Sequence, residues 1–416
     1  FSLRYSQAYL NERSALAISK TLALQEQDYE WSSLHPFFDN LILEGWLLHQ
    51  AEKILHIDKL DRFSLLMATG RYPIGAVSVV PLDPKGFEIP DPQDLLRKQE
   101  QQEAYKLSSP FAEFCPSCLL PSTDGFMHGP CAQNLWGSRR QVSIVLDKEN
   151  PLASFSATIH GGSISGAQKK GLFYFDTKDS SLVPGPRNST HILKPEGDFP
   201  ELPANEHLTM AIAQSLKFKV PSFSLLKAEH LGLVYIIKRF DRTSSGALLK
   251  EDMAQLLQVP SESKYQGSME RVAKTLTKFT ARLDLNDFFR RLLFCYVTGN
   301  GDMHLKNWAI LEDQDRVGEM GLSPCYDLLN TRVALPSEKG DMALSFLGKH
   351  TKLKASYFRK FALKELGLNE RYLDSIFAEL PYWQSTIETM IPHSALSPLL
   401  KKNYLKICRE RFNGLK

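Results

Sequence analysis

The chain has 416 residues, of which 43% are hydrophobic and 23% charged, as in an ordinary soluble globular protein with room for two or three domains. The formal net charge of +3 is small, which argues against nucleic acid or a membrane surface as the main partner. No apolar run approaches the roughly 20 residues of a membrane span, and nothing visible resembles a signal peptide. The six cysteines do not suggest a disulfide framework, so we expect the protein in a reducing cytoplasm.

Residues 1–85 are expected to form a small N-terminal subdomain. They carry neither an acid–base pair nor metal-ligand spacing, so their predicted role is packing or partner binding. Asp61 suits the cap of a helix that Gly70 ends. The elements predicted from the apolar pattern are, in order, a strand near 1–5, a turn and helix over 34–56, a helix over 58–69 and a strand over 74–80.

Residues 86–137 are predicted to hold a linker, with a Gln/Glu-rich helix near 93–107, and then a Cys/His-containing subdomain. Its four candidate metal ligands form a Cys-x2-Cys pair and a following His-x2-Cys pair: Cys115, Cys118, His128 and Cys131. This spacing suits tetrahedral Zn²⁺. The alternative is a metal-free subdomain with buried thiols. The sequence favours that alternative, because residues 132–137 are able to dock through apolar side chains without a metal.

Residues 138–240 are predicted to form a β-rich lobe around a loop of small residues, 161–171, whose backbone N–H groups and lysines suit phosphate oxygens. Lys194 ends an apolar extended run, where it is placed to bind phosphates. Glu206 opens a predicted helix and either pairs with Lys194 or acts as a favourable charge at the helix N-terminus. The predicted strands are 142–146, 154–159, 172–175, 190–194, 222–226 and 233–238.

Residues 241–416 are predicted to form a helical lobe, and residues 239–242, which follow the last predicted strand, stand where a kinase hinge presents backbone groups to adenine. Gly367 and Pro381 are expected to end helices. The predicted helices are 251–257, 269–279, 285–298, 356–367, 370–380 and 395–412. The predicted fold class is therefore α+β, with two lobes as in protein kinases.

The chemistry is expected to centre on residues 292–331. An apolar helix stops at Gly299-Asn300-Gly301, which forces a loop that carries Asp302 and, five residues later, Asn307. A predicted hairpin then returns Asp327 to the same end. Phosphoryl transfer uses such a set, with one carboxylate for the attacking hydroxyl and an Asn and an Asp for Mg²⁺. The motif departs from the common kinase pattern, because no His-Arg-Asp precedes the loop and Tyr326-Asp327-Leu328 replaces Asp-Phe-Gly.

Six short motifs together resemble the HipA-type toxin kinases of bacterial toxin–antitoxin systems, and the likeness runs over essentially the whole chain. The motifs are Ser-Gly-Ala-Gln-x-Lys (165–170), His-Ile-Leu-Lys-Pro (191–195), Arg-Phe-Asp-Arg (239–242), Glu-Asp-Met (251–253), Gly-Asp-Met-His-x-Lys-Asn (301–307) and Tyr-Asp (326–327). Residues 1–85 resemble that family's small N-terminal subdomain, and the Cys/His stretch resembles HipT-like members.

The resemblance implies an ATP-dependent serine/threonine kinase with Asp302 as catalytic base and Asn307 and Asp327 as Mg²⁺ ligands. It also implies autophosphorylation at Ser163 or Ser165. The ATP-binding residues that it implies are Ser165, Gly166, Ala167, Gln168, Lys169, Lys170, Lys194, Lys238, Arg239, Phe240, His304, Tyr326 and Asp327.

The partners implied by the resemblance are a protein substrate, such as an aminoacyl-tRNA synthetase, and a HipB-like DNA-binding antitoxin, with no direct contact to nucleic acid or membrane. Two other functions stay open at this point. One is a catalytically inactive kinase-fold binding partner or corepressor, and the other is a small-molecule phosphotransferase on a related fold.

Overall fold

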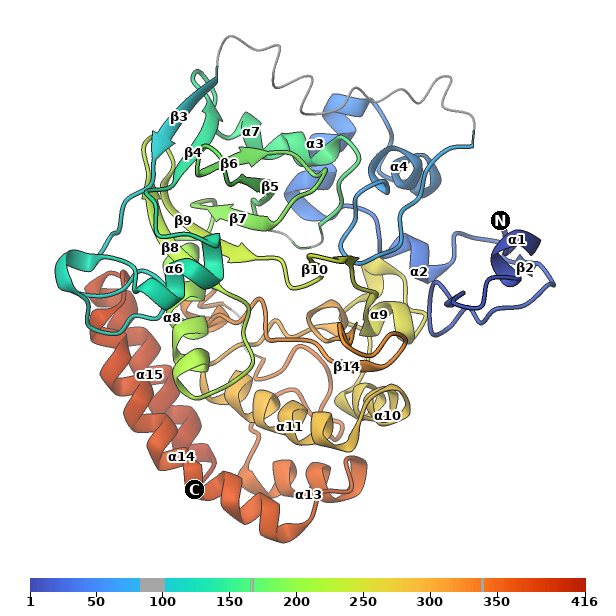
Figure 1. Ribbon diagram of the computed structural model, residues 1–416. Helices are drawn as coiled ribbons and strands as arrows, with labels where there is room; N and C mark the ends of the chain where they lie inside the picture. Colours follow the sequence, from blue (N-terminus) through green and yellow to red (C-terminus); the bar gives the residue numbers. More distant parts are fainter. Residues whose placement is uncertain (83–101, 165, 167, 338–339) are drawn as a thin grey trace.

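The structure is a computed structural model that describes residues 1–82, 102–164, 166, 168–337 and 340–416. A β-rich lobe lies above a helical lobe, and the N-terminal segment lies beside both (Figure 1). The predicted α+β fold with two lobes is therefore confirmed. In the part of the chain that is described, no helix is long and apolar enough to cross a membrane.

The upper lobe is built on a mixed sheet that contains seven of the described strands, in the order β3-β4-β6-β5-β7-β9-β8. All neighbours pair antiparallel except β4 and β6, which run parallel. The strands are β3 (Gln102–Lys106), β4 (Ser143–Asp147), β5 (Gly171–Asp176), β6 (Ser181–Pro184), β7 (His191–Pro195), β8 (Phe223–Ala228) and β9 (Gly232–Lys238). Helix α8 (Leu202–Ser215) packs against β8 and β9 and also against α14 (Glu370–Met390) of the lower lobe, so it joins the two lobes.

The lower lobe is helical, as predicted, and its core is continuous with the apolar face of α8. Besides α14, its helices are α9 (Met253–Leu256), α10 (Met269–Phe279), α11 (Arg282–Val297), α12 (Thr331–Ala334), α13 (Ala355–Glu365) and α15 (Pro398–Gly414), with the 3-10 turns η3 (Ser261–Ser263), η4 (Leu305–Asn307) and η5 (Ile391–His393). In chain order, the helices α13, α14 and α15 form the outer, red part of the lobe in Figure 1.

A small sheet at the junction of the lobes carries the predicted hairpin. Strands β13 (Ala309–Glu312) and β14 (Met320–Leu322) pair antiparallel, and β12 (Lys250–Asp252) adds to the other edge of β13. The predicted helix over 251–257 is therefore shorter, because its first residues belong to β12. A second hairpin joins β10 (Arg242–Thr243) to β11 (Gly246–Ala247) shortly after β9.

The N-terminal segment packs against the loop of small residues. Its apolar core includes Ile159, Ile164 and Leu172 of the upper lobe, and Tyr72 N–H donates to the carbonyl of Gly161 at 2.6 Å. Its elements are β1 (Ser2–Leu3), α1 (Gln7–Leu10), β2 (Tyr29–Glu30), α2 (Pro36–Asp39), α3 (Gly45–Leu55) and α4 (Arg62–Thr69). Asp61 caps α4 through Ser64 N–H at 3.0 Å and Gly70 ends it, as predicted.

Two predicted strands are wrong. Residues 154–159 are helical, in α7 (Ala153–Ser156) and η2 (Ala157–Ile159), because the fully buried Phe155 and Ile159 are four residues apart and so share a helix face. Residues 74–80 form no strand in the described structure. Their backbone contacts the residues that follow β9 instead, since Gly75 N–H donates to Asp241 Oδ2 at 2.7 Å.

Two helix predictions are also wrong, and a third is confirmed only in part. Pro381 lies inside α14 rather than ending it, because the buried Leu380 and Trp383 anchor the helix on both sides and offset a cost of about 3 kcal/mol. The predicted turn and helix over 34–56 is confirmed in part, because residues 45–55 form α3, while a short helix, α2, lies where the turn was expected. Residues 102–106 of the predicted helix and linker form β3, which pairs with β4, and 93–101 lie outside the described residues.

Candidate active site

Asp302, Asn307 and Asp327 line one cavity between the lobes. The loop after α11 carries the first two, and Asn307 Nδ2 donates to the Asp302 carbonyl at 2.8 Å, which fixes their relative position. Asn300 Nδ2 donates across to the Asp327 carbonyl at 3.3 Å and so ties this loop to the one after β14. The structure thus brings these three side chains together, while their roles stay predictions.

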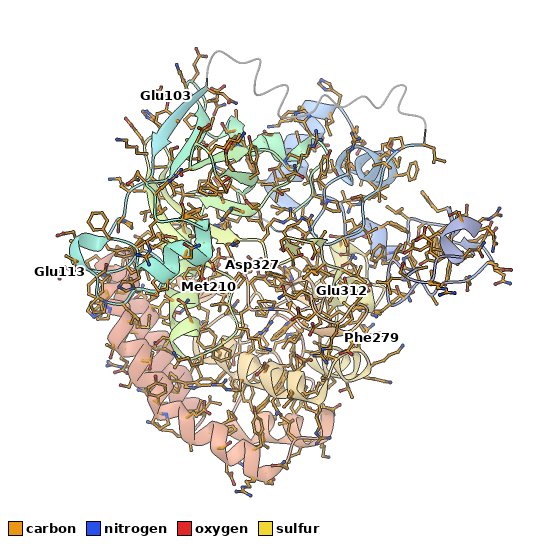
Figure 2. All side chains as sticks on the ribbon, viewed as in Figure 1. Glu103, Glu113, Met210, Phe279, Glu312 and Asp327 are labelled. Atoms are coloured by element: carbon orange, nitrogen blue, oxygen red, sulfur yellow. The ribbon has the colours of Figure 1, made fainter. Side chains whose placement is uncertain are left out.

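Asp327 lies near the centre of the molecule, between the two lobes (Figure 2). Its φ of 52° is unusual for a residue with a side chain and costs about 1–3 kcal/mol, a strain that clusters at functional sites. Lys194 Nζ lies 2.5 Å from Asp327 Oδ1. The same ammonium donates to both carboxylate oxygens of Glu206, at 2.7 and 2.9 Å.

This contact decides between the two predictions for Glu206. Helix α8 begins at Leu202, so Glu206 lies one turn inside it and is fully buried. A charge at that depth requires a partner, which Lys194 supplies. The strand β7 therefore presents Lys194 to an acid of α8 on one side and to an acid of the lower lobe on the other.

Burial opposes the charged form of all three groups. For Lys194, the negative charges of Asp327 and Glu206 outweigh burial and raise the pKa. For Asp327, the charges of Lys194 and Lys170 outweigh burial and hold the pKa below the ordinary range of a carboxyl group. Burial raises the pKa of Glu206 to about 7, against the attraction of Lys194. Lys194 and Asp327 are consequently charged at neutral pH, and Glu206 is close to its midpoint.

A second cavity adjoins the first and shares Lys170, Lys194, Asn307 and Asp327 with it. Its apolar walls include Ile74, Ile164, Ile192 and Ile237. The two cavities together form one elongated site with an apolar end and a charged end.

Phe240 and Tyr326 define the apolar end. Their ring centroids are 5.5 Å apart, and Tyr326 OH donates to the carbonyl of Lys306 at 2.9 Å, which holds its ring in place. Neither the amide nor the carbonyl of Phe240 makes a hydrogen bond to another described residue. This stretch of backbone is therefore available to a planar, hydrogen-bonding ligand.

The side chains of Lys238 and Arg239 are engaged elsewhere, although both line the cavity. Lys238 Nζ donates to the carbonyl of Asn134 at 2.8 Å. Arg239 is buried and binds Asp241 Oδ2 at 2.7 Å and Ser189 Oγ at 2.6 Å. Their contribution to ligand binding is accordingly restricted to backbone and shape.

The predicted site residues of the loop of small residues differ in their surroundings. Ser163 lines the apolar cavity, Gly166 and Gln168 line the charged one, and Lys170 lines both. Lys169 points away and pairs with Asp198 at 3.2 Å. Ser165 and Ala167 lie outside the described residues. A Cβ at Gly166 would lie 2.5 Å from Lys170 Nζ, so the absence of a side chain lets this lysine reach into the site.

Sequence reasoning missed two contributors. Tyr265, on the loop before α10, donates its OH to Asp302 Oδ1 at 2.7 Å, and no local motif predicts this contact. Lys250 lines the apolar cavity, with its Nζ 5.5 Å from the Tyr326 ring centroid. The Glu-Asp-Met motif that follows Lys250 is the signal that could have located it.

The site fits a magnesium nucleotide. The carboxylate of Asp327 and the amide of Asn307 offer the oxygen ligands that Mg²⁺ prefers, and the lysines supply charge for phosphates. Two buried polar atoms at the charged cavity, Gln168 Nε2 and His304 Nδ1, have no hydrogen-bond partner among the described residues. Burial lowers the pKa of His304 to about 3, so its ring is neutral. Such atoms need a partner, which a polar ligand would provide.

A β-rich lobe, a helical lobe and an acid–amide–acid set at the cavity between them define a protein-kinase-like fold. Comparison with known protein families gives two matches, both to HipA domains. The profile of the HipA-like C-terminal domain matches residues 162–385, and that of the HipA N-terminal domain matches residues 1–80. The chain belongs to the HipA family.

The curated relatives agree with this assignment. Putative kinase Y4mE of Sinorhizobium fredii is 26% identical over 382 residues, which cover 88% of this chain and 80% of the relative. Putative kinase Y4dM of the same organism is 34% identical over 210 residues, but these cover only 47% of this chain and 50% of the relative. The serine/threonine-protein kinase toxin HipA of Shewanella oneidensis is 23% identical over 355 residues, covering 79% of this chain and 70% of the toxin.

A solved structure of similar fold is HipA of Shewanella oneidensis MR-1 in its complex with HipB and operator DNA. The TM-score is 0.66 at 20% sequence identity, and the match covers 100% of this chain and 92% of that one. This likeness establishes the fold.

Proposed function

We propose that this protein is an ATP-dependent serine/threonine protein kinase of the HipA type. The observation that carries the proposal is the meeting of Asp302, Asn307, Asp327 and Lys194 at one cavity, where Lys194 is also paired with the buried Glu206. Phosphoryl transfer depends mainly on positioning and on charge stabilisation, and this set supplies both.

Each residue has a distinct proposed role. Asp302 accepts the proton of the attacking serine or threonine hydroxyl, whose oxygen bonds to the γ-phosphorus as ADP leaves. Tyr265, through its bond to Asp302 Oδ1, orients that carboxylate. Asn307 and Asp327 would hold Mg²⁺, which neutralises phosphate charge when bound. Lys194 binds the phosphates.

The nucleotide would lie along both cavities. The adenine fits between the isoleucine side chains and the Phe240–Tyr326 pair, with its polar edge toward the backbone of 238–240. The phosphates then extend toward Lys170 and Lys194 in the charged cavity. Because the Lys238 and Arg239 side chains are engaged elsewhere, adenine recognition would rest on backbone groups.

The proposal is tested by incubating purified protein and cell lysate with Mg²⁺ and [γ-³²P]ATP. The wild type is expected to label protein bands, and Asp302→Ala is expected to abolish labelling while it still binds ATP. Asp198→Ala, at a side chain that is 80% exposed, is the matched control and should label like wild type. Label in a small product, or equal labelling by Asp302→Ala, would contradict the proposal.

We also propose that the kinase phosphorylates a serine of its own loop, Ser163 or Ser165. Ser163 is buried at the wall of the apolar cavity, so its modification requires the loop to leave this position. A phosphate would add nearly two negative charges there and switch the enzyme off by holding the loop out. Intact-mass measurement after incubation with Mg·ATP should show one added phosphate in wild type and none in Asp302→Ala. Unmodified wild type would refute it.

The proposed substrate and partner are drawn from the likeness to the family. A translation protein such as an aminoacyl-tRNA synthetase is the proposed acceptor, and a HipB-like antitoxin is the proposed partner, as in the Shewanella complex. Phosphoproteomics of cells that express wild type or Asp302→Ala would identify the acceptor. Co-purification of a DNA-binding protein with the tagged kinase would test the partner.

A further inference from the structure

The four Cys and His side chains singled out in the sequence meet at one point, outside the kinase site. Their ligand atoms, Cys115 Sγ, Cys118 Sγ, Cys131 Sγ and a ring nitrogen of His128, all lie within 4.8 Å of one another. With Zn–S near 2.3 Å and Zn–N near 2.0–2.1 Å, tetrahedral ligands stand about 3.4–3.8 Å apart. The separation of Cys118 Sγ from His128 Nδ1 is 3.3 Å. We propose that Cys115, Cys118, His128 and Cys131 bind one structural Zn²⁺ ion.

The orientation of His128 is the most specific support. Its Nε2 lies 3.0 Å from the carbonyl of Pro121, to which it can only donate, so the proton sits on Nε2. Nδ1 then carries a lone pair and faces the thiols. Metal-binding histidines are held in this way, with the second ring nitrogen bonded to a carbonyl or carboxylate. A histidine that merely filled space would not need this arrangement.

The metal-free alternative explains less. Helix α6 (Gly129–Trp136) does dock through apolar side chains, since Leu135 and Trp136 are buried in the upper lobe. That docking does not account for the cluster, in which Cys118, His128 and Cys131 are only partly buried. All six cysteines lie in the described part of the chain and none forms a disulfide. The folded arrangement therefore favours zinc over the metal-free subdomain, which the sequence alone favoured.

The proposed ion has a structural position. The two residues between Cys115 and Cys118 bond to the kinase lobe: the Pro116 carbonyl accepts from Leu225 N–H of β8 at 2.8 Å, and the Ser117 carbonyl accepts from His207 Nε2 of α8 at 3.1 Å. His207 directly follows Glu206, the partner of Lys194. Four protein ligands leave no open position for catalysis. The ion would therefore fix a turn that packs against α8 beside the residue that pairs with Lys194.

One more contact joins the same segment to the lower lobe. Phe114, next to Cys115, stacks on His393 of η5 with ring centroids 4.2 Å apart. The segment that holds α6 runs along the upper end of α15 in Figure 1. Loss of the ion should thus loosen a junction between the lobes and lower the stability of the whole chain.

Metal content tests the proposal independently of kinase activity. Untagged wild type, purified without chelator, is expected to contain about one Zn²⁺ per chain by elemental mass spectrometry. Cys131→Ser and His128→Asn should lose it at least tenfold, because each removes a ligand. Cys408→Ser, at a buried cysteine of α15 outside the cluster, is the matched control and should keep it.

Because the variants that lack a ligand can fail to fold, a second test uses the wild type alone. Replacement of zinc by Co²⁺ should give the intense ligand-field and thiolate charge-transfer bands of a tetrahedral sulfur site. A wild type that binds neither metal, weak octahedral bands without charge transfer, or a Cys–Cys disulfide found by alkylation and peptide mapping would each overturn the assignment. Unchanged metal content in Cys131→Ser would do so as well.

Discussion

Glu44 connects the N-terminal segment to the loop that carries Asp302 and Asn307, and its replacement by Gln should destabilise the protein. The carboxylate lies 2.5 Å from Lys306 Nζ and 2.8 Å from Lys264 Nζ, and it accepts a hydrogen bond from Ser261 Oγ. Lys306 precedes Asn307, and its side chain is only 1% exposed. Removal of Glu44's charge leaves a buried ammonium without its acid.

The expected loss is about 3 kcal/mol at pH 7. Breaking a buried pair costs about 3–5 kcal/mol. The lower end applies because Lys306 Nζ keeps the Asn40 carbonyl at 3.1 Å and Ser261 Oγ at 3.3 Å. The contact with Lys264, whose side chain is 16% exposed, adds little after screening by solvent.

The pH dependence gives a second signature. Burial opposes the Glu44 charge, but Lys306 and Lys264 outweigh it and lower the pKa below the ordinary 4.5. The stability from this group is therefore fully present above pH 4.5 and is lost as the pH falls below that value. The difference between wild type and Glu44→Gln should accordingly shrink under acid conditions.

Urea unfolding followed by tryptophan fluorescence, repeated from pH 7 downward, measures both effects. Glu52→Gln, at a partly exposed acid of α3, is the matched control and should stay within about 0.5 kcal/mol of wild type. A Glu44→Gln protein as stable as that control at pH 7 would refute the reasoning. So would a difference that grows as the pH falls.

Three further outcomes are expected. Asp241→Asn should lower the free energy of unfolding by about 3–5 kcal/mol, because it leaves the fully buried guanidinium of Arg239 unpaired, and calorimetry that shows no loss would contradict this. Glu206→Gln should gain stability relative to wild type as the pH rises from 4.5 to about 7. Burial raises the pKa of Glu206 in the folded state, so the contribution of this group to the stability of the wild type is lost over that range. A difference in urea midpoints that does not change with pH would count against this expectation. Tyr265→Phe should lower kcat by less than Asp302→Ala while the KM for ATP is unchanged, and an equal loss would mean that Tyr265 does more than orient Asp302.

The local part of the candidate site could be predicted from the sequence. The breakers at Gly299-Asn300-Gly301 end an apolar helix, and the following hairpin brings Asp327 back, so the spacing alone determines the arrangement. Asp61 and Gly70 likewise mark α4 by their own chemistry. Such signals depend on neighbours along the chain and need no knowledge of the tertiary structure.

The non-local part could not be predicted. Glu44 and Lys306 are far apart in the sequence, and nothing near Glu44 indicates a buried partner. Pro381 carries a strong local stop signal, which packing around Leu380 and Trp383 overrides. The Cys and His ligands show their spacing in the sequence, but only the folded turn shows that the four side chains meet.

The resemblance to HipA-type kinases indicates the loop that carries Asp302 and Asn307, whereas the side chains around that loop are known only from the structure. Glu206 had two equally reasonable roles until α8 was seen to begin one turn earlier. Lys169 and Lys170 are adjacent and chemically alike, yet only Lys170 lines the cavities. The burial of a side chain and the direction in which it points distinguish two such residues, and the local sequence encodes neither.

The most direct test of the central claim is a calorimetric titration of ATP into wild type and Asp327→Ala, each with and without Mg²⁺. If Asn307 and Asp327 hold the cation beneath the phosphates, Mg²⁺ should strengthen ATP binding by wild type about tenfold or more, and this gain should vanish in Asp327→Ala. Equal gains in both proteins, or no effect of Mg²⁺ on wild type, would contradict the account.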